Sequence, residues 1–178
     1  MTIPTLADSL DLNAINKMDR AAFTKTLGEI FENSPWIAQK AWNARPFASI
    51  TKLHAAMVAV VQNALIDQQV TLLRAHPDLA GKEAQAGKLT DSSTVEQASA
   101  GLNGLSEEEL ARLTKLNADY RAKFGFPFII AVRNHTKEGI FFEFERRLAN
   151  PTDTEFATNL RQVYAIAQLR LNKLFGSK

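Results

Sequence analysis

The fold class of this chain depends on residues 126–132, which read Phe-Pro-Phe-Ile-Ile-Ala-Val. By periodicity alone this apolar run fits either a buried strand or a buried turn of helix. A single strand would have no partner elsewhere in the sequence, and an isolated strand is not stable. We therefore expect buried, partly extended backbone here, inside an otherwise all-α protein.

The sequence before this run carries helical periodicity and start signals. Asp19 is placed to cap a helix whose apolar residues follow at i, i+4, i+7 and i+8. Ser34 and Pro35 open another helix, with the serine as N-cap and the proline at the first helical position. A long apolar pattern begins at Ser49 and predicts one helix that reaches the neighbourhood of His76, where the following proline ends it.

The remaining helices are predicted from residues 93, 106, 136 and 153 onward. Ser93 and Glu96 fit the S-x-x-E pattern of a capping box, and Ser106 begins a second one. Gly125 is a natural stop for the helix that starts at Ser106. We find no repeats, linkers or low-complexity tracts. The expectation is one all-α domain over residues 1–178, a single-domain bundle of about seven to nine helices.

Composition excludes several classes of partner. The 178 residues are 46% hydrophobic, and a net charge of +2 arises from 21 basic and 19 acidic residues that are interspersed. No cationic patch indicates nucleic acid or a membrane surface as a partner, and small neutral or anionic ligands remain open. With no cysteine, a disulfide or a thiolate nucleophile is excluded. The N-terminus lacks signal-peptide features, and a cytoplasmic location is expected.

Two short segments carry candidate chemistry. Residues 75–82 and 93–97 bring an imidazole, His76, and a carboxylate, Glu96, to neighbouring element ends, which is the pairing that proton transfer needs. A histidine at a helix end is also a common cationic partner of the helix dipole. Glu96 can equally be no more than the second half of a capping box. Both interpretations stay open at this point.

Arg170 is harder to explain structurally. It follows Val163 by seven residues and Phe156 by fourteen, so on a helix it lies within roughly 20 to 40° of those apolar positions. A guanidinium on that face must reach water or find an anion. If it points into a cavity, it can bind a carboxylate or ureido oxygen bidentately.

Six blocks of the sequence, in this order, resemble those of the 2-oxo-4-hydroxy-4-carboxy-5-ureidoimidazoline (OHCU) decarboxylase family. They are residues 32–36, 45–47, 75–79, 93–97 with 100–102, 124–130 and 169–171. No single block is specific, but the ordered set is. The resemblance implies an all-helical, cofactor-free and usually dimeric enzyme that converts the unstable product of urate oxidation and ring-opening hydrolysis into (S)-allantoin, with release of CO2.

The resemblance also implies roles for individual residues. His76 matches the catalytic proton donor, Glu96 the carboxylate beside it, and Arg170 the site arginine. The implied substrate contacts are Pro77, Ser93, Thr94, Val95, Gln97, Phe128, Ile129, Ile130, Ala131 and Val132. There are two departures: Ala131 stands where many relatives have cysteine, and Asn134 with His135 replaces a loop that usually contains glycine.

The chemistry of that substrate suits these residues. Its departing carboxylate is on a carbon bonded to a ring C=N group, so the ring itself receives the electrons. No metal, pyridoxal phosphate or thiamine is then needed, and we expect no cofactor. His76 is assigned to proton transfer, Glu96 to orienting it or holding the substrate hydroxyl, and Arg170 to an anionic oxygen. Gln97, Ser93 and the backbone near Ile130 are expected to hold the ureido and ring amides.

Two other classes of function are alternatives to the decarboxylase. A metal-dependent hydrolase would use His54, His76 and His135 with a carboxylate, but these histidines have no compact ligand spacing. A helical partner-binding module without catalysis would explain the helices. It gives no reason for an arginine on an apolar stripe.

Overall fold

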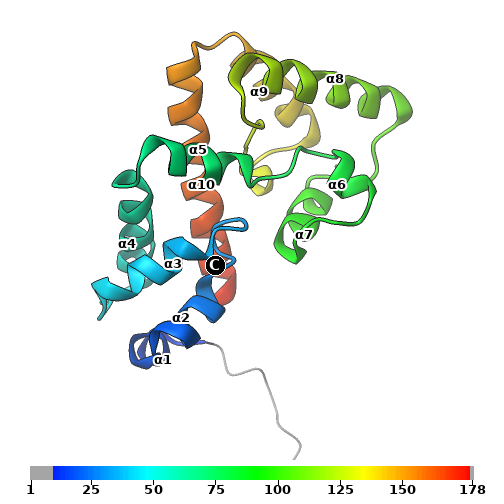
Figure 1. Cartoon of the computed structure of the whole chain (residues 1–178). Helices are drawn as coiled ribbons and strands as arrows, with labels where there is room; N and C mark the ends of the chain where they lie inside the picture. Colours follow the sequence, from blue (N-terminus) through cyan, green and yellow to red (C-terminus); the bar gives the residue numbers. More distant parts are fainter. Residues whose placement is uncertain (1–9, 177–178) are drawn as a thin grey trace, which may run out of the picture.

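The computed structural model describes residues 10–176, which form helices arranged around one long central helix, α10 (Thr152–Leu174) (Figure 1). On one side lie α1 (Leu12–Lys17), α2 (Arg20–Leu27), α3 (Pro35–Ala41), α4 (Ile50–Gln62) and α5 (Ile66–Arg74). On the other lie α6 (Lys82–Gln85), α7 (Asp91–Ser99), α8 (Glu107–Phe124) and α9 (Lys137–Leu148). Two 3-10 turns are η1 (Trp42–Ala44) and η2 (Val132–Asn134).

The all-α prediction is confirmed. Of the ten α-helices in residues 10–176, eight have seven or more residues, and this part of the chain contains no strand. The expected bundle of about seven to nine helices lacked the two short ones, α1 and α6. Both are too short to show the apolar periodicity by which helices are recognised in a sequence.

Most of the predicted helix ends are in place. The carboxylate of Asp19 accepts a hydrogen bond from the amide of Ala22 at 2.8 Å, which caps α2. Ser106 and Glu109 form the reciprocal capping box of α8. Gly125 ends that helix in the left-handed conformation, with φ +77°.

The prediction of a single long helix from Ser49 to His76 is wrong. Helix α4 ends at Gln62 and α5 begins at Ile66, and the chain bends by 115° between the two helices. The side-chain amide of Gln69 donates to the carbonyl of Val61 at 2.8 Å and so satisfies the open end of α4. The apolar pattern continues through the break, with Leu65 75% exposed at the turn, and therefore hides it.

No single helix in residues 10–176 is long and apolar enough to cross a membrane.

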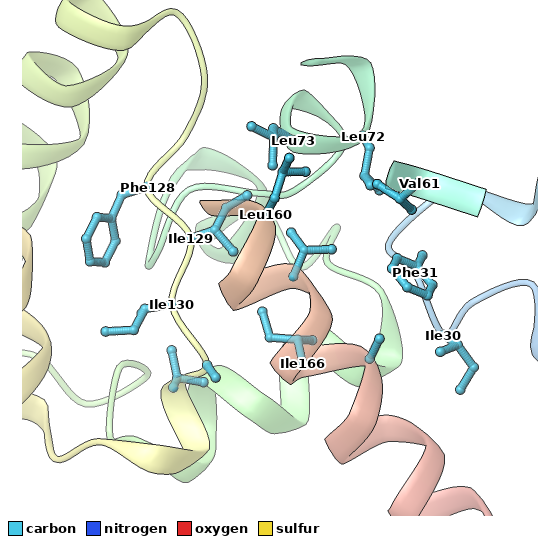
Figure 2. Packing of buried hydrophobic residues seen from close by; sticks show 14 of the residues in the cluster. Ile30, Phe31, Val61, Leu72, Leu73, Phe128, Ile129, Ile130, Leu160 and Ile166 are labelled. Carbon is cyan, nitrogen blue, oxygen red and sulfur yellow. The ribbon is translucent and has the colours of Figure 1, made fainter. Parts of the chain in front are cut away.

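The apolar run after Gly125 is buried, as predicted, and lies outside any helix up to Ala131, while Val132 begins η2. Side chains of α10 take the place of a partner strand. Asn159 accepts from the amide of Ile129 at 3.0 Å and donates to the carbonyl of Pro127 at 3.0 Å. Gln162 accepts from the amide of Ala131 at 2.9 Å. Figure 2 shows Ile129 pointing toward α10 while Phe128 and Ile130 point the other way, the alternation of an extended chain.

A buried ion pair between α9 and α10 also fixes this segment. Arg147, on α9, lies 2.6 Å from the carboxylate of Glu155 and donates to the carbonyl of Ile129 at 2.8 Å. Its guanidinium also donates to Asn159 at 2.7 Å. A buried arginine needs such a complete set of acceptors. The segment is therefore held along one edge by α9 and α10, and its other edge is left for the site.

Candidate active site

His76 lies directly after α5, because Pro77 disfavours a helical conformation at the residue before it. Its side chain is 7% exposed. Ring atom Nδ1 lies 3.0 Å from the carbonyl oxygen of Leu72, and a carbonyl can only accept, so Nδ1 carries the proton. Burial lowers the pKa of His76 to about 4, a shift that the Leu72 hydrogen bond and the nearby Glu32 carboxylate only partly oppose. The histidine is thus neutral at pH 7 and is not a cation paired with the helix dipole.

The N-cap of α7 lies three residues earlier than predicted. Thr90, not Ser93, is its N-cap, and the Thr90 hydroxyl accepts from the amide of Ser93. The alternative interpretation of Ser93 and Glu96 as a capping box is therefore wrong. The run Thr-Asp-Ser-Ser offers four possible N-caps in a row, so spacing alone could not choose among them. Ser93 and Glu96 are both released from a capping role and lie on the face of α7 toward α10.

Glu96 pairs with Arg170 and not with His76. Nε of Arg170 donates to Oε1 of Glu96 at 2.8 Å, and Nη2 donates to Oε2 at 2.9 Å, which is a bidentate ion pair. Arg170 also donates from Nη1 to the carbonyl of Glu29 at 3.2 Å. The arginine on the apolar stripe of α10 is therefore buried against anions and does not extend to water.

Glu32 is a buried site residue to which no role was assigned from the sequence. Its side chain is 1% exposed, and its Oε2 lies 2.7 Å from Nη2 of Arg170, an ion contact without hydrogen-bond geometry. Oε1 accepts from the hydroxyls of Thr90 at 2.7 Å and Ser93 at 3.0 Å. The only sequence signal was its position in the first of the six family-like blocks, because a turn glutamate has no periodicity to mark it.

Gln97 joins the site from the next position on α7. Its side-chain oxygen accepts from the amide of Ala80 at 2.9 Å, which fixes the amide group and leaves its NH2 as a donor. Thr94 and Val95 lie on the exposed side of α7, and Val95 is 45% exposed. Of the implied substrate contacts on α7, the structure thus brings Ser93 and Gln97 to the site and leaves Thr94 and Val95 outside it.

Two hollows meet at the Glu96–Arg170 pair. The smaller one, called here the inner cavity, has a volume of about 40 Å³ and is lined by residues from four segments of the chain. It is lined by His76, Pro77, Leu79, Ser93, Glu96, Gln97, Phe128, Ile129, Ile130, Val132, Ile166 and Arg170. An outer cleft of about 380 Å³ lies on the other side of the pair. Glu96 and Arg170 line both hollows and therefore form the wall between them.

The three histidines do not share a site. His54 lies on α4 and contacts the carbonyl of Tyr164 at 2.8 Å, and His135 ends η2. Within residues 10–176, no group of three His, Cys, Asp or Glu side chains is placed to hold a metal ion. The set of ligands that the metal-hydrolase alternative needs is thus not assembled in this part of the chain.

Comparison with known proteins places the chain in a family. The sequence profile of OHCU decarboxylase matches residues 16–172. An OHCU decarboxylase of Haloferax volcanii is 42% identical over 95% of this chain and 98% of its own length. The Xenopus laevis enzyme of the same name is 40% identical over 93% of this chain and 95% of its own.

Solved structures agree with these relatives. The crystal structure of an (S)-allantoin synthase superposes with a TM-score of 0.75 and 31% identity, over 93% of this chain and 54% of that one. This chain therefore spans about half the length of that synthase. An OHCU decarboxylase crystallised in the presence of (S)-allantoin shares the fold, with a TM-score of 0.68 and 20% identity over 90% of this chain.

The fold and the site define an all-helical carboxy-lyase with a buried imidazole next to an arginine–carboxylate pair. This chain belongs to the OHCU decarboxylase family.

Proposed function

We propose that the inner cavity beside His76 is where this chain carries out the reaction of its family: OHCU loses CO2 and becomes (S)-allantoin, in the degradation of urate. The assignment rests on the fact that several reactive groups border the same cavity. The free ring nitrogen of His76, the Glu96–Arg170 pair and the backbone of Ile130 all border one cavity. These groups come from four separate parts of the sequence.

The backbone of Ile130 is available to a ligand. Hydrogen bonds to α9 and α10 engage the amides of Ile129 and Ala131 and the carbonyls of Pro127 and Ile129. In extended backbone, alternate residues direct their polar groups to opposite edges. The amide and carbonyl of Ile130 accordingly find no partner within residues 10–176. A buried peptide group without a partner is costly, and the ureido or ring amide of the substrate would supply one.

His76 is suited to moving a proton in two directions. Because it is neutral at pH 7 with the proton on Nδ1, its Nε2 is a base in the resting site. In the proposed reaction the C–COO⁻ bond breaks, its electron pair enters the ring C=N group, and the ring nitrogen takes a proton from water. Nε2 accepts the proton of the substrate hydroxyl as that oxygen becomes a carbonyl, and returns it to the ring carbon on one face. The sum consumes one proton and sets the chirality of (S)-allantoin.

Glu96 and Arg170 bind the polar groups of the substrate. Arg170 orients an anionic oxygen, and Glu96 accepts from the substrate hydroxyl or a ureido N–H. The cavity of about 40 Å³ has room for a few water molecules, since one water needs at least ~10–15 Å³. A ureidoimidazoline therefore requires Glu96 or Arg170 to move. We infer that the bound ligand replaces part of their mutual contact.

A turnover assay tests the proposal. Urate is oxidised enzymatically in the cuvette, its hydrolysis product is passed at once to the purified chain, and circular dichroism follows the (S)-allantoin formed. The proposal expects an optically active product and a large loss of rate in His76→Asn. Racemic product at the uncatalysed rate with the parental protein would contradict it.

Assembly and location remain predictions. The family resemblance implies a homodimer, and Leu65 and Ile66, 75% and 64% exposed at the α4–α5 turn, offer apolar surface for a contact. Light scattering of the purified chain at several concentrations would measure its mass. The cytoplasmic location is an expectation from the sequence alone, and cell fractionation would test it.

A further inference from the structure

Glu32 is more deeply buried than Glu96 and has hydroxyl partners besides Arg170, although both carboxylates contact Arg170. Each oxygen of Glu32 has at least one contact. Oε1 accepts hydrogen bonds from the hydroxyls of Thr90 and Ser93, and Oε2 forms the ion contact with Nη2 of Arg170. Glu32 lies in the turn between α2 and α3 and lines neither the inner cavity nor the outer cleft. Glu96 lines both, and its side chain is 12% exposed. Glu32 is thus the fixed partner and Glu96 the exchangeable one.

The ionisation of Glu32 agrees with this distinction. Burial acts to raise its pKa, but the charge of Arg170 and the hydrogen bond from Thr90 outweigh it, so the pKa lies below its usual range. Glu32 is therefore an anion at neutral pH. Arg170 carries one positive charge and contacts the carboxylates of both Glu32 and Glu96. The guanidinium stays neutralised when Glu96 leaves it.

We propose that Glu32 is a positioning residue that acts as the permanent counter-ion of Arg170: it fixes the guanidinium and weakens its attraction for any other carboxylate. The inference rests on the proposed function, in which Arg170 meets the anionic group of the substrate. An arginine without a counter-ion would hold that group tightly. Stabilising the bound carboxylate more than the transition state opposes its loss as CO2.

Glu32→Gln tests this through a gain of affinity, which damage to the site does not produce. The probe is acetate, a simple carboxylate. Its inhibition constant against OHCU turnover should fall about tenfold or more, since a charge within ~4 Å acts strongly at the effective dielectric of a protein site. The kcat should fall by about tenfold or more while KM does not rise. Acetate that binds equally or more weakly in Glu32→Gln overturns the proposal.

Two matched variants separate charge from structure. Thr90→Val removes a hydrogen bond to Glu32 and the cap of α7 but keeps the Glu32 charge, so acetate affinity should stay parental even if the melting temperature falls. Glu96→Gln removes the exchangeable anion and should also tighten acetate. Tightening in Thr90→Val equal to that in Glu32→Gln would contradict a role for charge.

A second readout does not depend on catalysis. Acetate should raise the melting temperature of Glu32→Gln at concentrations that leave the parental protein unchanged, because a ligand stabilises the state that it binds. This shift keeps the counter-ion proposal testable if the chain fails to decarboxylate OHCU. If Glu32→Gln does not fold, Glu32→Asp keeps the charge but shortens its reach to Arg170, and a smaller tightening in the same direction is expected. Weakened acetate binding in Glu32→Asp overturns the proposal.

Discussion

Nδ1 of His76 faces the carbonyl oxygen of Leu72, one helical turn earlier, at 3.0 Å. This contact decides which ring nitrogen serves the site. The carbonyl accepts a hydrogen bond from Nδ1–H, so Nε2 keeps its lone pair, and the last turn of α5 holds the ring in place. The carboxylate expected to orient the histidine, Glu96, contacts Arg170 instead.

His76→Asn should abolish most of the activity and keep the fold. Asparagine can still donate to the Leu72 carbonyl, so the free energy of unfolding should fall by only about 1 kcal/mol. Loss of the proton-transfer group should lower kcat by about 10² to 10⁴. Circular dichroism measures both turnover and thermal unfolding. Retained binding of (S)-allantoin is the control, and a folded variant with the parental rate would refute the role of His76.

The stability of the chain should depend on pH through His76. Its folded pKa of about 4 lies below the ordinary 6.5, so the unfolded chain binds the proton more readily. The contribution is fully present above pH 6.5 and is lost as the pH falls from 6.5 toward 4. Between pH 7 and pH 4.5 the parental protein should lose about 2 to 3 kcal/mol more than His76→Asn. Urea unfolding at the two pH values measures the difference, and equal losses would contradict the neutral, buried histidine.

Glu96→Gln separates the site role from a structural one. Because Thr90 caps α7 and Arg170 keeps Glu32 as a counter-ion, the unfolding free energy should fall by less than the about 3 to 5 kcal/mol that breaking a buried pair costs. The rate should fall by about two orders of magnitude if the carboxylate contacts the substrate. Glu145→Gln, at an exposed ion pair on α9, is the matched control for loss of one negative charge. Near-parental turnover would return Glu96 to a purely structural role.

Arg170→Met should destabilise the fold in a pH-dependent way. It leaves the carboxylate of Glu32 buried without its counter-ion, and removal of one partner from a buried pair costs about 3 to 5 kcal/mol. Protonation of the stranded Glu32 relieves that cost, so the deficit relative to the parental protein should be smaller at pH 5 than at pH 8. Chemical unfolding at both values tests the sign. A deficit that grows at low pH would show that Glu32 is not the stranded charge.

Activity should survive exhaustive chelation. The substrate ring provides the electron sink, and the three histidines do not converge with carboxylates into a ligand set within residues 10–176. Elemental analysis of the purified chain accompanies the assay. Loss of turnover on chelation and its return on addition of zinc or manganese would reverse this prediction.

Local sequence signals predicted much of the fold, because helices are specified by neighbours in the chain. The caps at Asp19 and Ser106 and the stop at Gly125 are decided by side chains within one turn of the helix end. The same reasoning failed between Ser49 and His76, because apolar periodicity continues through the break at residues 63–65. The break depends on Gln69, whose amide satisfies the end of α4 only after α5 has turned back.

The sequence by itself determined the helical class, the place of His76 at a helix end, and the presence of an arginine on an apolar face. Only the tertiary structure decided their partners. Glu32, Glu96 and Arg170 are separated by 64 and 74 residues along the chain, yet they form one buried ion cluster. Residues 126–131 likewise remain unpaired as a strand because α10 supplies Asn159 and Gln162. Periodicity indicates which face of a helix is buried. The anions that pair with a buried cation come from distant parts of the chain, so only the tertiary structure determines them.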